Sequence, residues 1–460
     1  MPSYATPGVY IEEDASLSLS INNSPTAIPV FIGKFLKKDG SSPAKGSCIK
    51  ISSWLDFTSQ FLLSPTISVT ATAKAPPALK EGESALNKAD APLRADAKNT
   101  YTAAVTLPSN GAFAVQHYFN NGGGVCYVLP LVEPDKDKAK DELATLPGLI
   151  EQQQEITLLV CPETDTTLVT CTKQDVYSAL NDLLLNKVDY FLIADSTNGS
   201  DTPSTNAEKT AVYYPDLLTS FICSRPADAN IVLTGYTDSK VTNLAVLQTN
   251  SADEYAAAKI VVDAAWATAK VPTTAITLPP SAAVAGAYAG TDASRGVWKA
   301  PANVALNNAT PVTVVTDADQ GTMNDKGINV IRNFTGKGTL IWGARTLDKT
   351  DAWRYVPVRR LFNSVERDIK RAMQLAVFEP NSQPTWETVR SAIDHYLYGL
   401  WQQGALSGSK ASEAYFVHIG KGVTMTEDDI KQGKMIVKVG MAAVRPAEFI
   451  ILQFTQNVGQ

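Results

Sequence analysis

The sequence contains little of the chemistry on which hydrolases and metalloenzymes depend. Histidine, the commonest general base and metal ligand, occurs only as His117, His395 and His418 among 460 residues, and none of the three lies in an HExxH pattern. The sequence also has no GxSxG nucleophile elbow and no GxxxxGK(S/T) phosphate loop. A zinc hydrolase is therefore not expected, and we predict neither a cofactor nor a bound metal.

Cysteine pairs, a basic excess and long apolar runs are missing as well. The five cysteines show no CxxC spacing, which predicts free thiols in a reducing compartment. The 40 basic and 46 acidic residues give a net charge of −6, so nucleic acid is not an expected partner. Apolar runs stay far below the roughly 18 residues of a membrane span, and the start MPSYATPGVYIEEDAS does not have the pattern of a signal peptide. We expect a cytosolic chain that does not insert into a membrane.

What the sequence does contain predicts a large protein of α/β and α+β character. Its length corresponds to about three domains at roughly 150 residues each. Residues 28–32 are typical of a buried strand, and Gly33 ends it. From 125 to 240, apolar runs alternate with helical patterns such as residues 174–187. This alternation predicts an α/β layer with a partly parallel sheet.

Composition suggests where the domains begin and end. Residues 65–99 are polar and rich in alanine, with few large apolar side chains, so we expect an exposed insertion that does not fold firmly. We assign an N-terminal arm to residues 1–22 and an α/β part, which includes this insertion, to residues 23–330. A C-terminal core domain follows at residues 331–443 and a C-terminal arm at residues 444–460.

One carboxylate has the position of a catalytic group. Residues 188–194 predict a buried strand that runs into Asp195, and acids at the carboxyl ends of strands in α/β domains often line active sites. The other interpretation is a carboxylate that stabilises a turn or caps a helix. No His or Lys close to Asp195 in the sequence matches a catalytic role. A hydrolase that uses Asp195 is the enzymatic alternative.

Two amphipathic helices are predicted in the last third of the chain, at residues 358–378 and 384–402. Apolar side chains follow one face of the first helix with a period of 3.6 residues. The charged side chains of this helix lie away from the apolar face. Five are positive and two are negative between Arg359 and Arg371, so the local charge is +3 on an acidic protein. Four basic side chains are expected to point away from the subunit's core: Arg360, Arg367, Lys370 and Arg371.

Both ends of the chain carry segments suited to strand pairing. Residues 16–21 alternate between apolar and polar side chains, as residues 434–441 do. After Pro446, the run 449–454 is apolar on both faces, which favours burial in a sheet of this chain or of a neighbour. The expected arm residues are Val9, Tyr10, Ile11, Leu17, Leu19, Ile21, Phe449, Ile450, Ile451, Leu452 and Phe454.

A series of motifs resembles the contractile tail sheath proteins of phages, R-type bacteriocins and extracellular contractile injection systems. The resemblance covers nearly the whole chain outside residues 65–99 and is densest after residue 278. In family order the motifs are TPGVYIEE (6–13), TAIPVFIG (26–33), LPPSAAVAGAYAGTDASRGVWKAPAN (278–303), WGARTL (342–347), WRYVPVRRL (353–361), VFEPN (377–381), GALSG (404–408) and RPAEFI (445–450).

The resemblance implies a structural polymer that catalyses no reaction. Sheath subunits of this family form hexameric rings stacked around an inner tube, and contraction of the sheath drives the tube through a target envelope. Their terminal arms add strands to neighbouring subunits, and a helix of the C-terminal region lies against the tube. The resemblance thus implies that the α/β part faces outward, that residues 331–443 lie near the tube, and that the basic face with Arg360, Arg367, Lys370 and Arg371 contacts an acidic patch of the tube. The implied partners are further copies of the chain, with or without sister sheath isoforms, the tube protein, and baseplate and terminal cap proteins. Assembly in the bacterial cytoplasm and a place in a virion or released phage-tail-like particle are implied as well.

Overall fold

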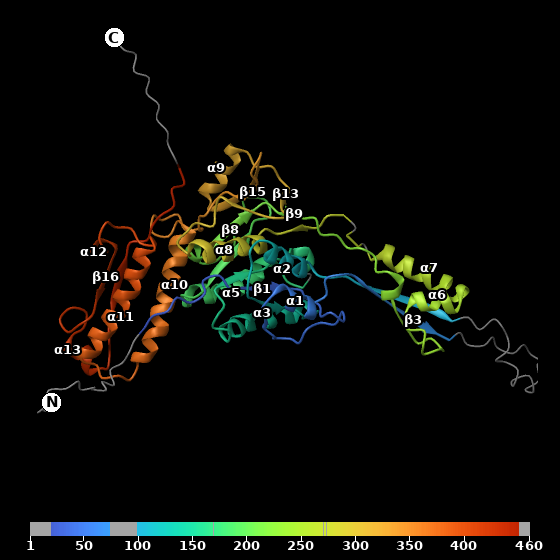
Figure 1. Ribbon diagram of the computed structural model, residues 1–460, viewed down its shortest axis with the longest axis horizontal. Helices are drawn as coiled ribbons and strands as arrows, with labels where there is room; N and C mark the ends of the chain where they lie inside the picture. Colours follow the sequence, from blue (N-terminus) through green and yellow to red (C-terminus); the bar gives the residue numbers. More distant parts are fainter. Residues whose placement is uncertain (1–19, 74–98, 169, 270, 273, 450–460) are drawn as a thin grey trace, which may run out of the picture. The chain divides into compact units, whose positions relative to one another are not determined.

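The computed structural model describes residues 20–73, 99–168, 170–269, 271–272 and 274–449 (Figure 1). The chain divides into two compact units. The α/β unit comprises residues 27–294 and 301–354, and the helical unit comprises residues 1–26, 295–300 and 355–460. The division after Arg354 differs from the boundary expected at residue 330. Residues 331–354 stay with the α/β unit because two of its strands pair there.

One large mixed sheet forms the centre of the α/β unit. Six neighbouring strands, from β14 to β5, run parallel, and β12, β15 and β2 pair antiparallel at the edges. This confirms the α/β layer predicted from the sequence. Within the described residues the sheet has nine strands in the order β12 (Val304–Ala305), β15 (Gly338–Ile341), β14 (Ile328–Phe334), β8 (Thr210–Tyr214), β7 (Phe191–Asp195), β6 (Leu158–Val160), β1 (Pro29–Gly33), β5 (Cys126–Pro130) and β2 (Ile49–Ile51).

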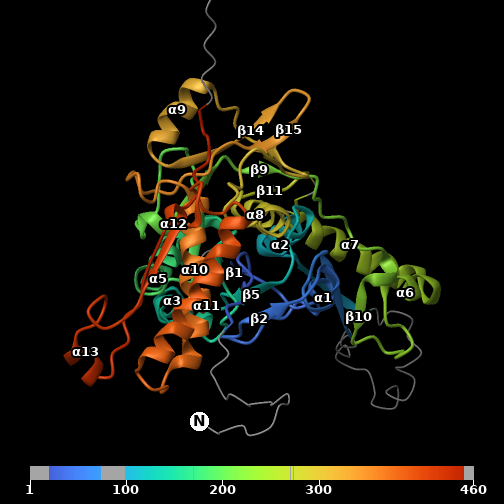
Figure 2. The same cartoon turned by 60° about the vertical axis from the view of Figure 1, so that its left-hand side comes forward.

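Helices α3 (Lys136–Glu151) and α5 (Lys173–Asn186) cover one face of this sheet (Figure 2). The helix predicted at residues 174–187 is thereby confirmed. The central strands are buried at every residue, as a parallel sheet with helices on both faces requires. Apolar side chains that pack between these helices and the sheet include Val30, Ile32, Leu129, Leu146, Ile150, Leu159, Leu180, Leu183 and Leu192.

Helices α2 (Asn110–Asn120) and α8 (Ser281–Arg295) cover the opposite face. Phe31 points to this side because it lies between two residues of the first face, and its ring centroid is 5.1 Å from that of Tyr118 in α2. The hydroxyl oxygens of Tyr213 in β8 and Tyr288 in α8 are 2.6 Å apart. The two helices pack so closely that a Cβ atom on Gly286 would lie 2.5 Å from the carbonyl oxygen of Tyr118.

A second, smaller sheet takes one of its strands from the segment expected to be an insertion. β3 (Thr66–Thr72) pairs with β4 (Thr100–Thr106) over its whole length, and β10 (Val232–Thr234) pairs with β3. Ile67, Val69 and Ala71 alternate inward against α6 (Leu244–Asn250) and α7 (Ala252–Thr268). The expectation that folding fails from residue 65 onward is therefore wrong, because β3 buries one face. Residues 74–98 lie outside the described residues.

The remaining elements of the α/β unit are short. The Gly336–Gly338 segment forms the turn between β14 and β15, and both glycines have positive φ. The short elements of this unit are α1 (Trp54–Gln60), α4 (Asp165–Leu168), α9 (Asp317–Asp325), β9 (Leu217–Leu218), β11 (Thr277–Leu278) and β13 (Thr310–Pro311).

Two long helices, α10 (Val356–Met373) and α11 (Gln383–Gln402), form the helical unit. Leu361 and Val365 of α10 share a buried apolar cluster with Val389, Ile393 and Leu397 of α11. The predicted helix at 358–378 ends at Met373 and continues as a single 3₁₀ turn, whereas the second helix agrees with its prediction. The smaller elements are α12 (Ala411–Ala414), α13 (Glu427–Lys431), β16 (Tyr415–His418) and β17 (Lys438–Met441).

The smaller sheet gives a test that separates its strands from the segment between them. Thr72 pairs with Thr100, so a turn of four residues can replace residues 74–98. We expect this variant to keep the lobe, meaning the smaller sheet with α6 and α7, folded. It should gain up to about 2 kcal/mol in the free energy of unfolding through the shorter connection. Removal of residues 66–99 deletes β3 and should unfold the lobe. Hydrogen exchange of β4 and α7 measures both outcomes, and loss of protection in the linker variant would contradict the prediction.

Candidate functional site

The order of the parallel strands defines where a ligand would bind to this sheet. The chain proceeds from β1 to β5 on one side and then from β6 to β7 and β8 on the other, so the direction of winding reverses between β1 and β6. In open α/β sheets, ligands bind at the carboxyl ends of the strands beside such a reversal. The side chain of Glu163, just after β6, occupies this position.

Glu163 is completely buried. Its carboxylate accepts a hydrogen bond from the Lys34 amide at 2.9 Å and another from the hydroxyl of Thr167 at 2.6 Å. Burial raises the pKa of Glu163, and these hydrogen bonds oppose the rise. A Cβ atom on Gly33 would lie 2.7 Å from Cγ of Glu163, so the glutamate fills the space beside the end of β1. The position where a ligand would bind contains a side chain of the protein itself.

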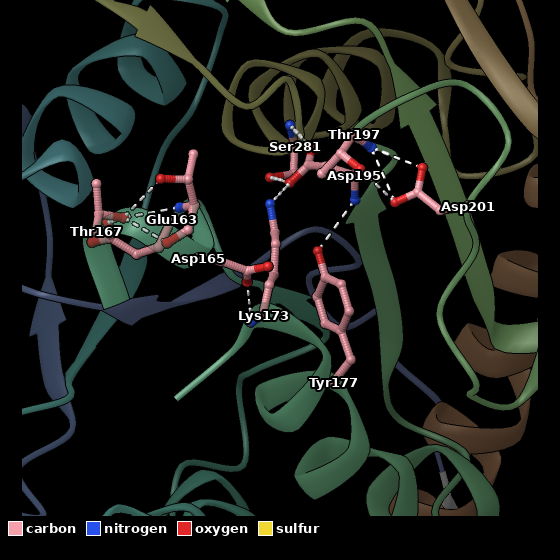
Figure 3. A network of polar contacts seen from close by, with 10 residues as sticks. Glu163, Asp165, Thr167, Lys173, Tyr177, Asp195, Thr197, Asp201 and Ser281 are labelled. Atoms are coloured by element: carbon pink, nitrogen blue, oxygen red, sulfur yellow. Dashed lines mark hydrogen bonds and ion pairs between the residues drawn. The ribbon is translucent and has the colours of Figure 1, made fainter. Parts of the chain in front are cut away.

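Asp195, the candidate catalytic residue, lies at the end of β7 in a second buried network (Figure 3). One carboxylate oxygen is 2.6 Å from Nζ of Lys173, and the side chain of Asp195 is only 2% exposed. The backbone amide and the hydroxyl of Ser281, the first residue of α8, donate to the carboxylate at 2.7 Å each. The hydroxyl of Tyr177 accepts from the Asp195 amide at 3.2 Å.

This geometry matches the second interpretation of Asp195, a carboxylate that caps a helix. Its charge faces the N-terminus of α8, where the helix dipole favours an anion. Burial lowers the pKa of Lys173, but the charge of Asp195, smaller effects of Tyr177 and Cys161, and the hydrogen bond to Asp195 together raise the pKa by more, so the ammonium is held in its charged form. A general acid or base needs access to a substrate, whereas each of these groups is buried against the protein's own groups.

Asp216 and Asp201 lie near the same edge and behave differently. Burial, and then the charge of Asp195, raise the pKa of Asp216 to about 6. Burial also acts to raise the pKa of Asp201, but hydrogen bonds from Ser196, Thr197 and Asn198 lower it to about 2. Asp201 accepts all these bonds within the loop after β7, which indicates a carboxylate that orders the loop.

Histidine, cysteine and acidic side chains do not form an alternative centre in the described parts of the chain. Burial lowers the pKa of His117 to about 4, so this histidine is neutral at physiological pH. Its Nε2 lies 3.1 Å from the carbonyl oxygen of Asn307. All five cysteines are free thiols, as predicted. No three His, Cys, Asp or Glu side chains among the described residues gather as metal ligands, and no described helix is long and apolar enough to cross a membrane.

Helix α10 corrects the expectation for its basic face. Arg360 is 3% exposed and Arg367 is 4% exposed, so these side chains do not point into solvent. Arg371 is half-buried, and Lys370 alone of the four expected residues is exposed. The charges of this face are buried because they bind the backbone of a segment near the N-terminus.

That segment is Ser24–Thr26. Arg360 donates to the Thr26 carbonyl at 3.0 Å, and Arg367 donates to the Pro25 carbonyl at 2.8 Å. In the other direction, the Ser24 amide donates to Asp368 at 3.3 Å. Nη1 of Arg371 lies 3.1 Å from the Ser24 hydroxyl oxygen. The polar face of α10 therefore binds three consecutive residues of the chain.

Exposed apolar side chains follow the end of α10. Leu375 is 59% exposed, Val377 is 57% exposed and Phe378 is fully exposed. Phe378 also has a φ of +71°, which is rare for a residue with a bulky side chain. Together with Lys370, these residues define an apolar and basic tip of the helical unit.

Most expected arm residues lie outside the described part of the chain. Ile21 packs at the edge of the apolar cluster between α10 and α11, and Phe449 is 71% exposed. The candidate acceptor for an added strand is the sheet of β16 and β17. Within the described residues this sheet has only these two strands. The residues outside the described part are Val9, Tyr10, Ile11, Leu17, Leu19, Ile450, Ile451, Leu452 and Phe454.

Comparisons with known proteins define the class to which this fold belongs. Residues 218–347 match the model of the phage tail sheath protein central domain, and residues 348–457 match that of the phage tail sheath C-terminal domain. Residues of this chain are 29% identical over 134 positions to the tail sheath protein of Vibrio phage KVP40. That match covers 28% of this chain and 20% of the phage protein, so the chain spans about a fifth of this relative's length.

Solved structures match over nearly the whole chain. A chain from the contracted helical sheath of the anti-feeding prophage is 42% identical, with a TM-score of 0.68, and the match covers 99% of this chain and 100% of that one. A chain of the contracted sheath complex of PVC, an extracellular contractile injection system, is 38% identical with a TM-score of 0.65 and covers 100% of this chain and 99% of its own. The chain belongs to the contractile tail sheath family.

The ion pair in the α/β unit can be tested with a double-mutant cycle. Asp195→Asn leaves the Lys173 ammonium buried without its counter-charge, so we expect a loss of about 3 to 5 kcal/mol in the free energy of unfolding. The double variant Asp195→Asn/Lys173→Met removes both charges. Its loss in the free energy of unfolding should be smaller than the sum of the losses in Asp195→Asn and in Lys173→Met alone.

A matched control uses the exposed pair of Glu151 and Lys187, whose charged atoms are 3.2 Å apart. Glu151→Gln should cost less than about 1 kcal/mol, because solvent screens an exposed pair. Urea unfolding followed by circular dichroism measures all four variants. Equal losses in the free energy of unfolding for Asp195→Asn and Glu151→Gln would contradict the prediction, because the buried charge of Asp195 would then contribute no more to stability than an exposed one.

Proposed function

We propose that this chain is the structural subunit of a contractile sheath. Copies of it polymerise as stacked rings around an inner tube, and contraction of the sheath drives the tube through a target cell envelope. The observation that carries this proposal is the 42% identity, over 99% of this chain, to a subunit of a contracted helical sheath. Contacts between copies that do not close on themselves extend into helical arrays, which is the assembly that a sheath requires.

The proposal includes no catalytic role. It is supported by the sheet edge, where Glu163 and Asp195 are buried and fill the positions at which an α/β enzyme binds its substrate. A sheath needs no nucleotide site, because the difference in free energy between two lattice packings can drive contraction. The extended packing is then held by a kinetic barrier.

Strand exchange between subunits is the connection that we propose within the polymer. Two observations support it. The sheet of β16 and β17 has two strands within the described residues, so strands from neighbouring subunits could pair at its edges. The sequence supplies strand-forming segments with apolar side chains at residues 9–11, 17–21 and 449–454.

The inner tube is the second partner, and the proposed contact is the tip of the helical unit. Its exposed members are Lys370, Leu375, Val377 and Phe378. Arg360 and Arg367 are not part of this contact, because they bind Ser24–Thr26. The corresponding surface of the tube should combine apolar side chains with acidic ones.

A baseplate and a terminal cap complete the proposed particle, which would assemble in the bacterial cytoplasm. A chain from the baseplate structure of the anti-feeding prophage is 41% identical to this one over 99% of its length. This similarity supports a place for the subunit at the baseplate as well as along the sheath.

The polymer and its arms are tested together by negative-stain microscopy and light scattering. We expect the full chain to form tubes, and variants without residues 1–19 or 450–460 to stay soluble monomers. Each interchain hydrogen bond contributes only about 0.5 to 1.5 kcal/mol, but every junction loses several at once. The variant with a short linker in place of residues 74–98 keeps both arms and is the control. Ordered tubes from either arm deletion would refute strand exchange.

The tube contact is tested with Lys370→Glu combined with Phe378→Ser. Each ion pair at such a rim contributes about 0.2 to 1 kcal/mol, but the contact repeats in every subunit. We therefore expect less extended sheath on purified tube, and weaker docking of the unaltered chain as salt rises. Lys431→Glu, an exposed change in α13, is the control. Normal assembly of the double variant on tube would move the contact elsewhere.

A further inference from the structure

The contacts between α10 and Ser24–Thr26 have an unusual composition. Two arginines, two turns apart on the helix, bind main-chain carbonyls, and Asp368 accepts a hydrogen bond from an amide in the opposite direction. The bonds to Thr26, Pro25 and the Ser24 amide involve only the backbone of the bound segment. Pro25 disfavours helical backbone at Ser24, and the chain bends at Thr26, beside the carbonyls that bind the helix. The helix therefore binds a short non-helical peptide largely independently of its side chains.

The polar face of α10 also depends on this peptide. Arg367 and Asp368 have side chains 4% and 0% exposed, and their nearest charged atoms are 3.7 Å apart. Tyr396 of α11 donates to Asp368 at 2.9 Å, which fixes the carboxylate from the other helix. Buried guanidinium groups need acceptors, and the carbonyls of Ser24–Thr26 supply them. Peptide and helix thus stabilise each other.

The position of the peptide in the chain gives these contacts a mechanical meaning. The first segment of the helical unit ends at Thr26, the α/β unit begins at Ala27, and β1, a central strand of the large sheet, starts at Pro29. A pull on the chain ahead of Ser24 would reach β1 after only a few residues if nothing held the segment between. Hydrogen bonds from α10 take up that pull within the helical unit.

We propose that Arg360, Arg367 and Asp368 form a clamp that holds the root of the N-terminal arm and keeps tension in the arm away from β1. The proposal rests on the proposed function, because tension arises where the arm joins a neighbouring subunit. The clamp fixes the point at which the arm leaves its own subunit. It also leaves the side chains of the arm available for the neighbour.

The test compares the full chain with the variant Arg360→Met/Arg367→Met. Hydrogen exchange of the soluble monomer reports on the amides of residues 22–28, and we expect exchange there about tenfold faster or more when the two charged donors are lost. The variant Arg360→Lys/Arg367→Lys keeps both charges without the planar fork and should show an intermediate rate. Arg390→Met is the control, since Arg390 is an exposed arginine that pairs with Glu387 on the same helix, α11.

Assembly is scored separately from exchange. Faster exchange together with lost or irregular tubes in the methionine variant, and neither change in Arg390→Met, supports the clamp. Unchanged exchange overturns it. Faster exchange with normal tubes shows a structural contact that the arm does not need, which also overturns it. If no chain forms tubes, the proposed function fails, but the exchange rates still decide whether α10 holds the segment. Should the methionine variant not fold, the lysine variant decides by the same measurements.

Discussion

A charged group removed from water needs a partner, and this requirement explains both polar sites of the chain. At the carboxyl edge of the large sheet, the Lys173 ammonium and the N-terminus of α8 surround the carboxylate of Asp195. In the helical unit, main-chain carbonyls surround Arg367 and Arg360. A buried charge costs several kcal/mol unless it is matched, so neither set of residues can be altered singly without a large loss of stability.

The two sites use this requirement for different purposes. Asp195 joins β7 to α8 and Glu163 joins β6 to the segment after β1, so both carboxylates fasten loops at the edge where related folds bind ligands. The α/β unit thereby gains a rigid edge, at which buried side chains of the protein itself lie where related folds bind a ligand. Rigidity suits a subunit that moves as a body between two packings of a lattice, because bistable arrangements need units that do not deform.

Much of the fold follows from the sequence, because apolar periodicity records burial directly. The strand that ends at Gly33, the helix at residues 174–187 and the helix at residues 384–402 were all predictable in this way. Residues 66–72 were not, because their short alternation is followed by a long polar stretch. The partner of Asp195 was also missed, since Lys173 lies 22 residues earlier and only the fold brings the two together.

The buried arginines show why charge alone is a poor guide to exposure. Opposite the apolar stripe of α10, a basic face is usually solvated, yet here it is rich in arginine rather than lysine and includes the small polar Asn363 and Ser364. Arginine is the residue whose planar fork suits buried hydrogen bonding, whereas lysine prefers water. The exposed Lys370 and the buried Arg367 follow that difference on neighbouring positions of one helix. Arg360 and Arg367 lie two turns apart on the same side of α10, and the long arginine side chains converge on the neighbouring carbonyls of Thr26 and Pro25. A helix face of this composition can therefore bind a backbone segment and need not face solvent.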